Sequence, residues 1–468
     1  MILGFRLSLL IVALTIHSLA QSAMISASLP DAPTIPAAGS SGQTIDNQGQ
    51  AATPSLSNST TRPRIRLTLK EAEALALKNN PQITSARLEA MASKQVVREQ
   101  RSIYWPTATA NLTAVDSHDD SRISAGGLNN PIIFARAAGG VTVGQLITDF
   151  GRTRNLVASS QFAAKASDQN ALATREQILL GVDQAFYNVL QAQAVLRVAN
   201  ETVSNRQVVV DQVQALAKSA LKSDLDLSFA QVNLAQAKLL LLDAQNNEKA
   251  AQASLAALLG YVTAQEFDVV DEPGPVPTPP GNLDELIKQA VDSRPELQAA
   301  NFQYESAEKS KSAERDASLP TISALGAVGG APIRDDRLTS WYGAVGVNMQ
   351  IPVFNGFLFS TRTREADLRA QAAREHLVDL RNTIAKNVRT SWLSVITAYD
   401  RLDVTSQLSK QANLALDLAQ TRYKLGLGSI VELSQAQLQQ TQAEITQAQA
   451  GYEYRLALSV LQYQTTGL

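Results

Sequence analysis

Residues 341 to 351 alternate apolar side chains with small or polar ones. Val345 and Val347 fall on one side of an extended chain, and Gly346 and Asn348 fall on the other. A period of two over about eleven residues predicts a β-strand with one apolar face, at the length of a tilted transmembrane strand. A half-buried strand of a soluble sheet would alternate in the same way. Three more stretches rich in glycine, threonine and β-branched residues bring the prediction to four strands: about 107 to 115, 139 to 147 and 321 to 329.

Helix-forming residues dominate the longest segments. Residues 152 to 217 and 357 to 424 contain no proline and only one glycine, Gly181, and they are rich in Ala, Gln, Leu, Arg and Glu. They predict two helices, each roughly 100 Å long at 1.5 Å per residue. The other expected helices are a returning helix after each of these, at 224 to 259 and 429 to 463, and one helix near the start of each half, at 68 to 104 and 282 to 318.

The last returning helix carries two stripes that repeat every seven residues. One stripe is Val431, Leu438, Ile445 and Tyr452, and the other is Ala436, Ala443, Ala450 and Ala457. At 100° per residue they lie about 140° apart around the helix. Two seams allow a helix to sit between two neighbours in a tunnel wall, and the glutamine-rich remainder suits water on both sides. An ordinary polar bundle would fit this helix equally well.

The whole pattern occurs twice along the chain. Leu69 and Pro81 return about 214 residues later as Leu283 and Pro295. Later matches, such as Asp226 with Glu432, are about 206 residues apart, so the copies differ by one variable loop. Two copies of one structural unit are therefore expected. The expected organisation is a first repeat at 65–267 with a β-hairpin at 107–147, a proline-rich connection at 268–281, and a second repeat at 282–468 with a β-hairpin at 321–351.

The N-terminal region predicts export. One basic residue, Arg6, precedes an apolar run and small side chains at cleavable positions, so residues 1–23 are expected to be a signal peptide. Residues 24–64, mostly Ser, Thr, Pro, Ala and Gly, are expected to be an extended low-complexity lead-in. Beyond the signal peptide no run of eighteen apolar residues occurs that would make a membrane helix.

Composition excludes several classes of chemistry. The chain has no cysteine, and its 41 basic and 43 acidic residues give a formal charge of −2, which implies no nucleic-acid partner. His17 lies in the expected signal peptide, and His118 and His376 are isolated from any metal-ligand spacing. No glycine-rich phosphate loop follows a strand. No catalytic, metal or cofactor site is therefore expected, and the chain is not expected to be an enzyme.

Four strands of membrane length cannot span a bilayer alone, because an open sheet would leave unpaired backbone groups in lipid. Closure requires several chains. Two chains would supply eight strands, nearly filled by side chains, and three would supply twelve with room for a lumen. The residues alone predict an oligomer without fixing its order.

The chain resembles the TolC-like outer membrane efflux proteins from about Leu67 to Leu468. Besides the duplication, the segments that carry the resemblance are Leu77 to Pro81, the strand entries after Pro106 and Pro320, Gln145 to Arg152, Ile351 to Gly356, and Tyr423 to Leu433. The order and duplicate spacing of these segments are specific, although no single one is.

The resemblance implies a mainly α-helical fold with transmembrane β-hairpins. Three chains would form a 12-stranded outer-membrane β-barrel continued by an α-barrel tunnel across the periplasm of a Gram-negative cell. Such a homotrimer is the passive, gated exit duct of a tripartite efflux or type I secretion system. Its partners are a periplasmic adaptor protein and an inner-membrane transporter. Small molecules, metals and proteins leave through ducts of this design, and the sequence does not choose among them.

The resemblance also places a gate at the two helical turns. Glu432 matches an acidic position of the constriction, whereas Gln435 stands where some members have a second carboxylate. Asp226 and its neighbour Asp224 occupy the corresponding place in the first copy. Each acidic residue could instead be a solvated carboxylate in a helix's first turn, favoured there by the helix dipole. Arg422 and Tyr423, which precede the second turn, are expected to hold it closed.

The turns themselves are the expected docking surface for the adaptor. Their residues are Leu221 and Lys222 in the first copy and Gly426, Leu427 and Gly428 in the second. The alternative is that each leucine packs back on its own hairpin.

The rival function is a secreted or periplasmic structural coiled-coil scaffold. That rival accounts for the helices but leaves the four alternating strands unexplained.

Overall fold

The computed structural model describes residues 65–116, 122–125, 128–132, 136–219, 221–262, 267–271, 274, 276–334 and 339–466. The expected signal peptide and lead-in lie outside these residues. Arg62–Leu468 forms one compact unit. Most of the described residues are helical and a few strands accompany them, which confirms the mainly α-helical part of the predicted fold class. Within the described residues, no helix has both the length and the hydropathy that crossing a membrane requires.

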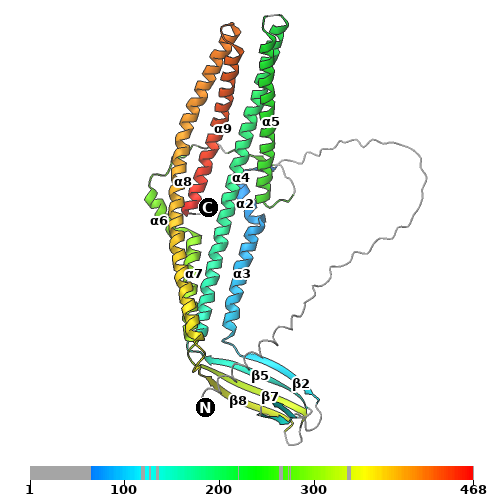
Figure 1. Ribbon diagram of the computed structural model, residues 1–468, viewed down its shortest axis with the longest axis vertical. Coiled ribbons are helices and arrows are strands. Elements are labelled where there is room, and N and C mark those ends of the chain that lie inside the picture. Colours follow the sequence, from blue (N-terminus) through cyan, green and yellow to red (C-terminus); the bar gives the residue numbers. More distant parts are fainter. Residues whose placement is uncertain are drawn as a thin grey trace, which may run out of the picture. The chain divides into compact units, whose positions relative to one another are not determined.

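Two long helical hairpins dominate this unit (Figure 1). Helix α4 (Arg152–Lys218) and helix α8 (Leu358–Lys424) each have 67 residues. They turn back into α5 (Asp224–Leu258) and α9 (Ile430–Thr466), respectively. Helix α4 packs against α9 as well as α5, so the two hairpins lie side by side.

Each half begins with two short helices where a single helix was expected, and that prediction was wrong. The pairs are α2 (Leu69–Asn79) with α3 (Pro81–Ser102), and α6 (Leu283–Ser293) with α7 (Pro295–Asp316). A proline cannot donate the helical hydrogen bond and keeps the residue before it extended. Asn80 and Arg294 accordingly have ψ angles of 124° and 123°.

The main sheet has four antiparallel strands in the order β2-β5-β7-β8. They are β2 (Thr107–Val115), β5 (Arg136–Thr148), β7 (Thr321–Ile333) and β8 (Trp341–Gln350). Each lies over one of the four stretches in which a strand was expected. The central β5–β7 pair joins the two halves of the chain, with Val141 opposite Val328. In this sheet β2 and β8 have a neighbour on one side only.

Two smaller sheets were not anticipated. Strands β3 (Arg122–Ala125) and β4 (Leu128–Ile132) pair with each other within the β-hairpin expected at 107–147, between β2 and β5 in the sequence. Strand β1 (Ile65–Leu67) pairs in parallel with β6 (Phe267–Val269), at the start of the proline-rich connection. Both β1 and β6 have three residues, too few for periodicity to distinguish them from loop.

Three apolar clusters hold the helices together. The first combines β1, β6, α2, α4 and α5 around Phe186 and Leu255. Another lies where α6, α7, α8 and α9 meet, around Val388 and Tyr454. The third lies near the hairpin ends and is described below. Fully burying one such side chain contributes roughly 1.5–3 kcal/mol, so these clusters fix the relative positions of the hairpins.

The end of the proline-rich connection, residues 276–281, packs against the second hairpin and is called the strap here. The Tyr454 hydroxyl donates to the Pro277 carbonyl at 2.5 Å, and Trp392 Nε1 donates to the Pro280 carbonyl at 2.9 Å. A proline-rich segment stays extended with little loss of entropy. The strap therefore ties the connection between the two halves to α8 and α9.

Candidate functional site

The end of the second hairpin is a tight turn that leads into a capped helix. The Leu427 and Gly428 N–H groups donate to the Arg422 carbonyl at 2.8 and 3.1 Å, and Gly426 has a φ of +75°. This is the left-handed conformation in which glycine commonly ends a helix. Ser429 Oγ then accepts from the Glu432 N–H at 3.1 Å, capping α9.

One ion pair crosses this turn. Arg422 Nε lies 3.0 Å from Glu432 Oε1, with the two side chains 55% and 43% exposed. A Cβ on Gly428 would lie 3.1 Å from Glu432 Oε2 and 3.2 Å from Arg422 Cβ. Glycine at this position therefore leaves room for the ion pair.

The end of the first hairpin uses its acidic residue differently. The backbone N–H and hydroxyl of Ser223 donate to Asp226 Oδ2 at 3.1 and 2.8 Å, and the Asp226 N–H donates back to Ser223 Oγ at 3.2 Å. This reciprocal capping box satisfies backbone donors that a helix start leaves free. Asp226 thus forms part of the cap of α5. Asp224 is exposed in the same first turn.

A lysine of the first turn contacts a tyrosine of the second hairpin. Lys222 Nζ lies 3.9 Å from the centroid of the Tyr423 ring and 3.5 Å from the Tyr423 carbonyl oxygen. An ammonium over an aromatic face is attracted by the ring quadrupole. The tyrosine is only 6% exposed, and burial, together with the Asp226 carboxylate, raises its pKa to about 12. The two turns are therefore joined by a cation–π contact.

An apolar cluster under the turns supports this contact. Val213, Leu234, Tyr423, Ile430 and Leu433 are all buried in it, so it draws on both hairpins. Beside the cluster, Asn233 Nδ2 donates to Ser434 Oγ at 2.7 Å. The second turn is thus held against the first by packing as well as by charge.

The structure brings together some of the expected site residues and leaves others apart. Arg422 contacts Glu432, and Lys222 contacts Tyr423. Gln435, like Asp224, is exposed and contributes to neither contact. The sequence predicted the residues of both turns but not which of them would meet, because the pairs form only after the chain reverses.

The leucines of the two turns are exposed rather than packed back on their own hairpins. Leu221 is 70% exposed and Leu427 is 69% exposed. Leu225 and Leu425, which the sequence reasoning missed, are exposed to a similar degree. The hairpin ends therefore present several apolar side chains together.

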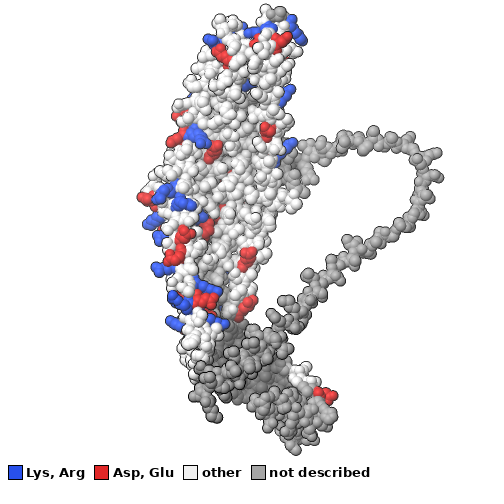
Figure 2. All heavy atoms as spheres, in the orientation of Figure 1, with Lys and Arg blue, Asp and Glu red and all other residues white. Residues whose placement is uncertain are grey.

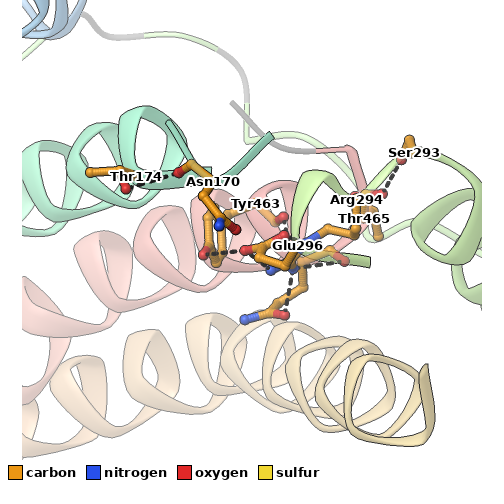
Figure 3. A network of polar contacts seen from close by, with 8 residues as sticks. Asn170, Thr174, Ser293, Arg294, Glu296, Tyr463 and Thr465 are labelled. Atoms are coloured by element: carbon orange, nitrogen blue, oxygen red, sulfur yellow. Dashed lines mark hydrogen bonds and ion pairs between the residues drawn. The ribbon is translucent and has the colours of Figure 1, made fainter. Parts of the chain in front are cut away.

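A buried polar network that sequence reasoning also missed lies where α6, α7 and α9 meet (Figure 3). Arg294 Nη2 lies 2.6 Å from Glu296 Oε1, and the Tyr463 hydroxyl donates to the same oxygen at 3.2 Å. Arg294 Nη1 also donates to the Gln464 side chain at 2.9 Å. These four residues are called the Arg294 network here. The Arg-Pro pair was visible in the sequence, but only as a marker of the repeat.

Charged side chains are unevenly distributed over the visible face of the helices. Figure 2 shows charged side chains gathered at the hairpin ends and along the α8 side, with a mostly uncharged surface elsewhere on the visible face of the helices. Among the described residues, no group of three or more His, Cys, Asp or Glu side chains is placed to hold a metal ion.

Comparison with known proteins gives one consistent result. The family model described as outer membrane efflux protein matches residues 74–261 and 286–465. The outer membrane efflux protein BepC of Brucella suis is 23% identical over 400 residues, covering 83% of each chain. The outer membrane protein TolC of Vibrio cholerae is 25% identical over 399 residues, covering 83% of this chain and 87% of its own. The solved structure of CusC aligns with a TM-score of 0.75 at 19% identity, over 88% of this chain and 96% of its own.

Proposed function

The chain belongs to the outer membrane efflux protein family, and from this membership we propose that it is the gated exit duct of a tripartite efflux or type I secretion system. It is an outer membrane protein and not an enzyme, as the resemblance implied. The duct itself supplies no energy. An inner-membrane transporter drives the cargo, a periplasmic adaptor joins transporter to duct, and this chain provides the path across the periplasm and the outer membrane.

The observation that carries the proposal is the open, apolar four-stranded sheet. Val345 is 93% exposed and Val347 is 70% exposed on β8, while β8 and β2 each lack a second neighbouring strand among the described residues. In lipid every backbone donor and acceptor needs a partner, so these edges must pair with strands of other chains. Three chains close a barrel of twelve strands with room for a lumen.

The two seams of α9 support a homotrimeric tunnel. Ala436, Ala443 and Ala450 are buried within the chain, whereas Val431 and Leu438 are 55% and 62% exposed. The alanine seam is therefore filled largely by the same chain, and the first half of the other seam is left for a neighbour, whereas Tyr452 at its end packs against the chain's own first cluster. A helix with neighbours on both sides is the unit of a closed helical wall.

The hairpin ends are the proposed gate. Three Glu432 carboxylates around the axis attract cations into the narrowest part of the path, with Asp226 and Asp224 adding negative charge from the first hairpin. Gln435 contributes no charge, so a second full carboxylate ring is not proposed. The Arg422–Glu432 pair and the Lys222–Tyr423 contact support the view that this end is held closed.

The same ends are the proposed adaptor-docking surface. Their exposed leucines, Leu221 and Leu427, offer small apolar contacts, and the glycines Gly426 and Gly428 leave the turn backbone accessible. Lys222 adds one positive charge beside them.

The function is tested by fractionation and by conductance. The protein is expected to require detergent for extraction, to migrate as a heat-labile trimer, and to give cation-selective pores in planar bilayers. Glu432→Gln should reduce the cation selectivity, and Asp226→Asn is the matched control with a smaller effect because that carboxylate caps a helix. A soluble protein without pores would instead support the coiled-coil scaffold. Unchanged selectivity in Glu432→Gln would contradict the acidic ring alone.

A further inference from the structure

A groove runs between the two hairpins near their ends. It has a volume of about 350 Å³ and is lined by residues of α4, α8 and α9, together with Lys222 from the first turn. Pockets that hold small organic molecules begin at about 300 Å³. The groove therefore has the size for a compact organic ligand that touches both hairpins at once.

The polar part of the groove is positively charged. Arg206, Lys222 and Lys424 line it, and the described lining residues include no Asp or Glu. Arg206 is only 6% exposed and donates to neutral acceptors, the Gln437 carbonyl at 2.8 Å and Thr441 Oγ1 at 3.0 Å. Among the described residues it forms no ion pair. A buried cation without an anionic partner is costly, so an anion in the groove would be stabilised.

The charge of Arg206 is opposed by one carboxylate, Glu444, which does not line the groove. Burial lowers the pKa of Arg206 to about 10, so the guanidinium remains positive at neutral pH. The carboxylate that acts against this shift is Glu444 on α9. Burial, and to a smaller extent Glu201 on α4, raise the pKa of Glu444, whereas Gln440 and Arg206 lower it. On the turn side, Asp226 is already engaged in its capping box.

Two buried polar atoms of lining residues have no hydrogen-bond partner within the described part of the chain. They are the Tyr423 hydroxyl and Gln437 Nε2. Tyr423 is 6% exposed and Gln437 is 2% exposed. An unsatisfied buried polar group costs about 1–3 kcal/mol, and native proteins leave few of them. Gln437 Nε2 can only donate and the Tyr423 hydroxyl can donate as well as accept, so a hydrogen-bond acceptor would satisfy both.

Apolar side chains complete the lining. Val209, Val213, Leu216, Leu416 and Leu433 line the same groove. We propose that this groove binds a small organic anion, a carboxylate with a compact apolar body. The carboxylate accepts hydrogen bonds from the cations and the unpartnered donors, and the apolar body packs against the valines and leucines. The site is separate from the acidic constriction at Glu432, which favours cations.

A ligand in this groove ties the first hairpin to the second. It contacts α4 on one side and α8 and α9 on the other, beside the Lys222–Tyr423 contact. Binding to this arrangement alone raises its stability by mass action. The expected consequence, fewer pore openings in the presence of the ligand, rests on the proposed channel function. Binding itself does not, so the two can fail separately.

The first test is calorimetric titration of the full chain in a non-ionic detergent. The probe is 4-phenylbutyrate, and the matched control ligand is 4-phenylbutyramide, which has the same apolar body without the charge. Phenylbutyrate is expected to bind about tenfold or more tightly than the amide, because hydrogen bonds to a charged group are the stronger ones. No binding of phenylbutyrate at millimolar concentration, or equal binding of both compounds, would overturn the proposal.

Variants then locate the site. Tyr423→Phe removes only the unpartnered hydroxyl and should keep the fold while weakening phenylbutyrate binding several-fold. Lys424→Gln should weaken binding by about two- to fivefold, since this lysine is exposed. Lys410→Gln is the matched control, because Lys410 is also exposed on α8 but does not line the groove. If Tyr423→Phe and Lys424→Gln bind like Lys410→Gln, the ligand lies elsewhere and the assignment is wrong.

Discussion

The ion pair of the Arg294 network and the ion pair at the second hairpin end differ in how far they are exposed to solvent. In the network, the Arg294 side chain is 6% exposed and that of Glu296 is 26% exposed. At the second hairpin end, Arg422 and Glu432 form a pair of similar chemistry with 55% and 43% of their side chains exposed. Breaking a buried ion pair typically costs about 3–5 kcal/mol, whereas an exposed pair contributes about 0–1 kcal/mol.

This difference separates a fixed region from one that can rearrange. The Arg294 network sits where α6, α7 and α9 meet, beside a core cluster. Opening it would leave the half-buried Glu296 carboxylate without its cationic partner. Arg422 and Glu432 can instead separate and be hydrated by water at little cost in free energy. This contrast supports the proposed gate at the hairpin ends, and the following predictions test it in order of decreasing effect.

Replacing Arg294 should have the largest effect on stability. Arg294→Met leaves the Glu296 carboxylate without its strongest partner, and we expect the free energy of unfolding to fall by about 3–5 kcal/mol. Denaturant titration followed by helical circular dichroism measures this change. Arg422→Met is the matched control at the exposed pair and should cost less than about 1 kcal/mol. Equal losses in the two variants would remove the contrast between the regions.

The stability of the region around the Arg294 network should also depend on pH. Burial, and then the Glu296 carboxylate, raises the pKa of Glu176 from 4.5 to about 7, with Arg294 and Arg175 opposing the shift. Because the folded state binds this proton more tightly, the contribution to stability is fully present below pH 4.5 and is lost as the pH rises through about 7. Burial raises the pKa of Asp183 in the same direction.

We therefore expect the free energy of unfolding to decrease between pH 4.5 and pH 7. Glu176→Gln should make this decrease shallower, since its side chain no longer titrates. Titrating stability against pH for both proteins measures the difference. Superimposable profiles would contradict the assignment of the pH dependence to Glu176.

The second turn should depend on glycine at one position. Gly426→Ala places a side chain at a φ of +75° and should cost about 1 kcal/mol. Gly451→Ala, inside α9, is the matched control, because an added Cβ there meets nothing within 4 Å. That change should stabilise the protein by about 0.5–1 kcal/mol. Thermal unfolding of the two variants should therefore shift in opposite directions, and a shift in the same direction would refute the turn argument.

The smallest effect on stability should accompany a clear effect on gating. Arg422→Gln is expected to change the free energy of unfolding by less than about 1 kcal/mol but to increase the open fraction in single-channel recordings. Arg369→Gln is the matched control, since Arg369 forms an exposed ion pair with Glu365 at 2.6 Å on the same helix. If Arg422→Gln and Arg369→Gln change the open fraction equally, the position of the ion pair does not matter for gating.

The sequence predicted the long helices and the strands because their signals are local. Residues 152 to 217 have no proline, and α4 spans Arg152–Lys218. The alternation over 341 to 351 similarly coincides with β8, Trp341–Gln350. The wrong prediction of single helices at 68 to 104 and 282 to 318 came from giving too little weight to Pro81 and Pro295. Proline is common at the first position of a helix, so both prolines indicate helix starts.

Contacts between distant segments could not be predicted in the same way. Lys222 meets Tyr423 only because two hairpins about 200 residues apart in sequence lie side by side. The different uses of Asp226 and Glu432 also depend on local geometry that the matching sequence positions do not reveal. Pairing of the Arg294 network requires α7 to meet the end of α9, which no periodic pattern specifies.

The strap gives the second hairpin a fixed point about which it can rotate. Tyr454, bound to the Pro277 carbonyl, lies 24 residues along α9 from Ile430, at the start of that helix. At 1.5 Å per residue this makes a lever arm of about 36 Å. A tilt of about 5° around the pinned point would move the start of α9 by roughly 3 Å, close to the length of one hydrogen bond. A small rotation at the strap would therefore move the start of α9 far enough to replace the contacts made there.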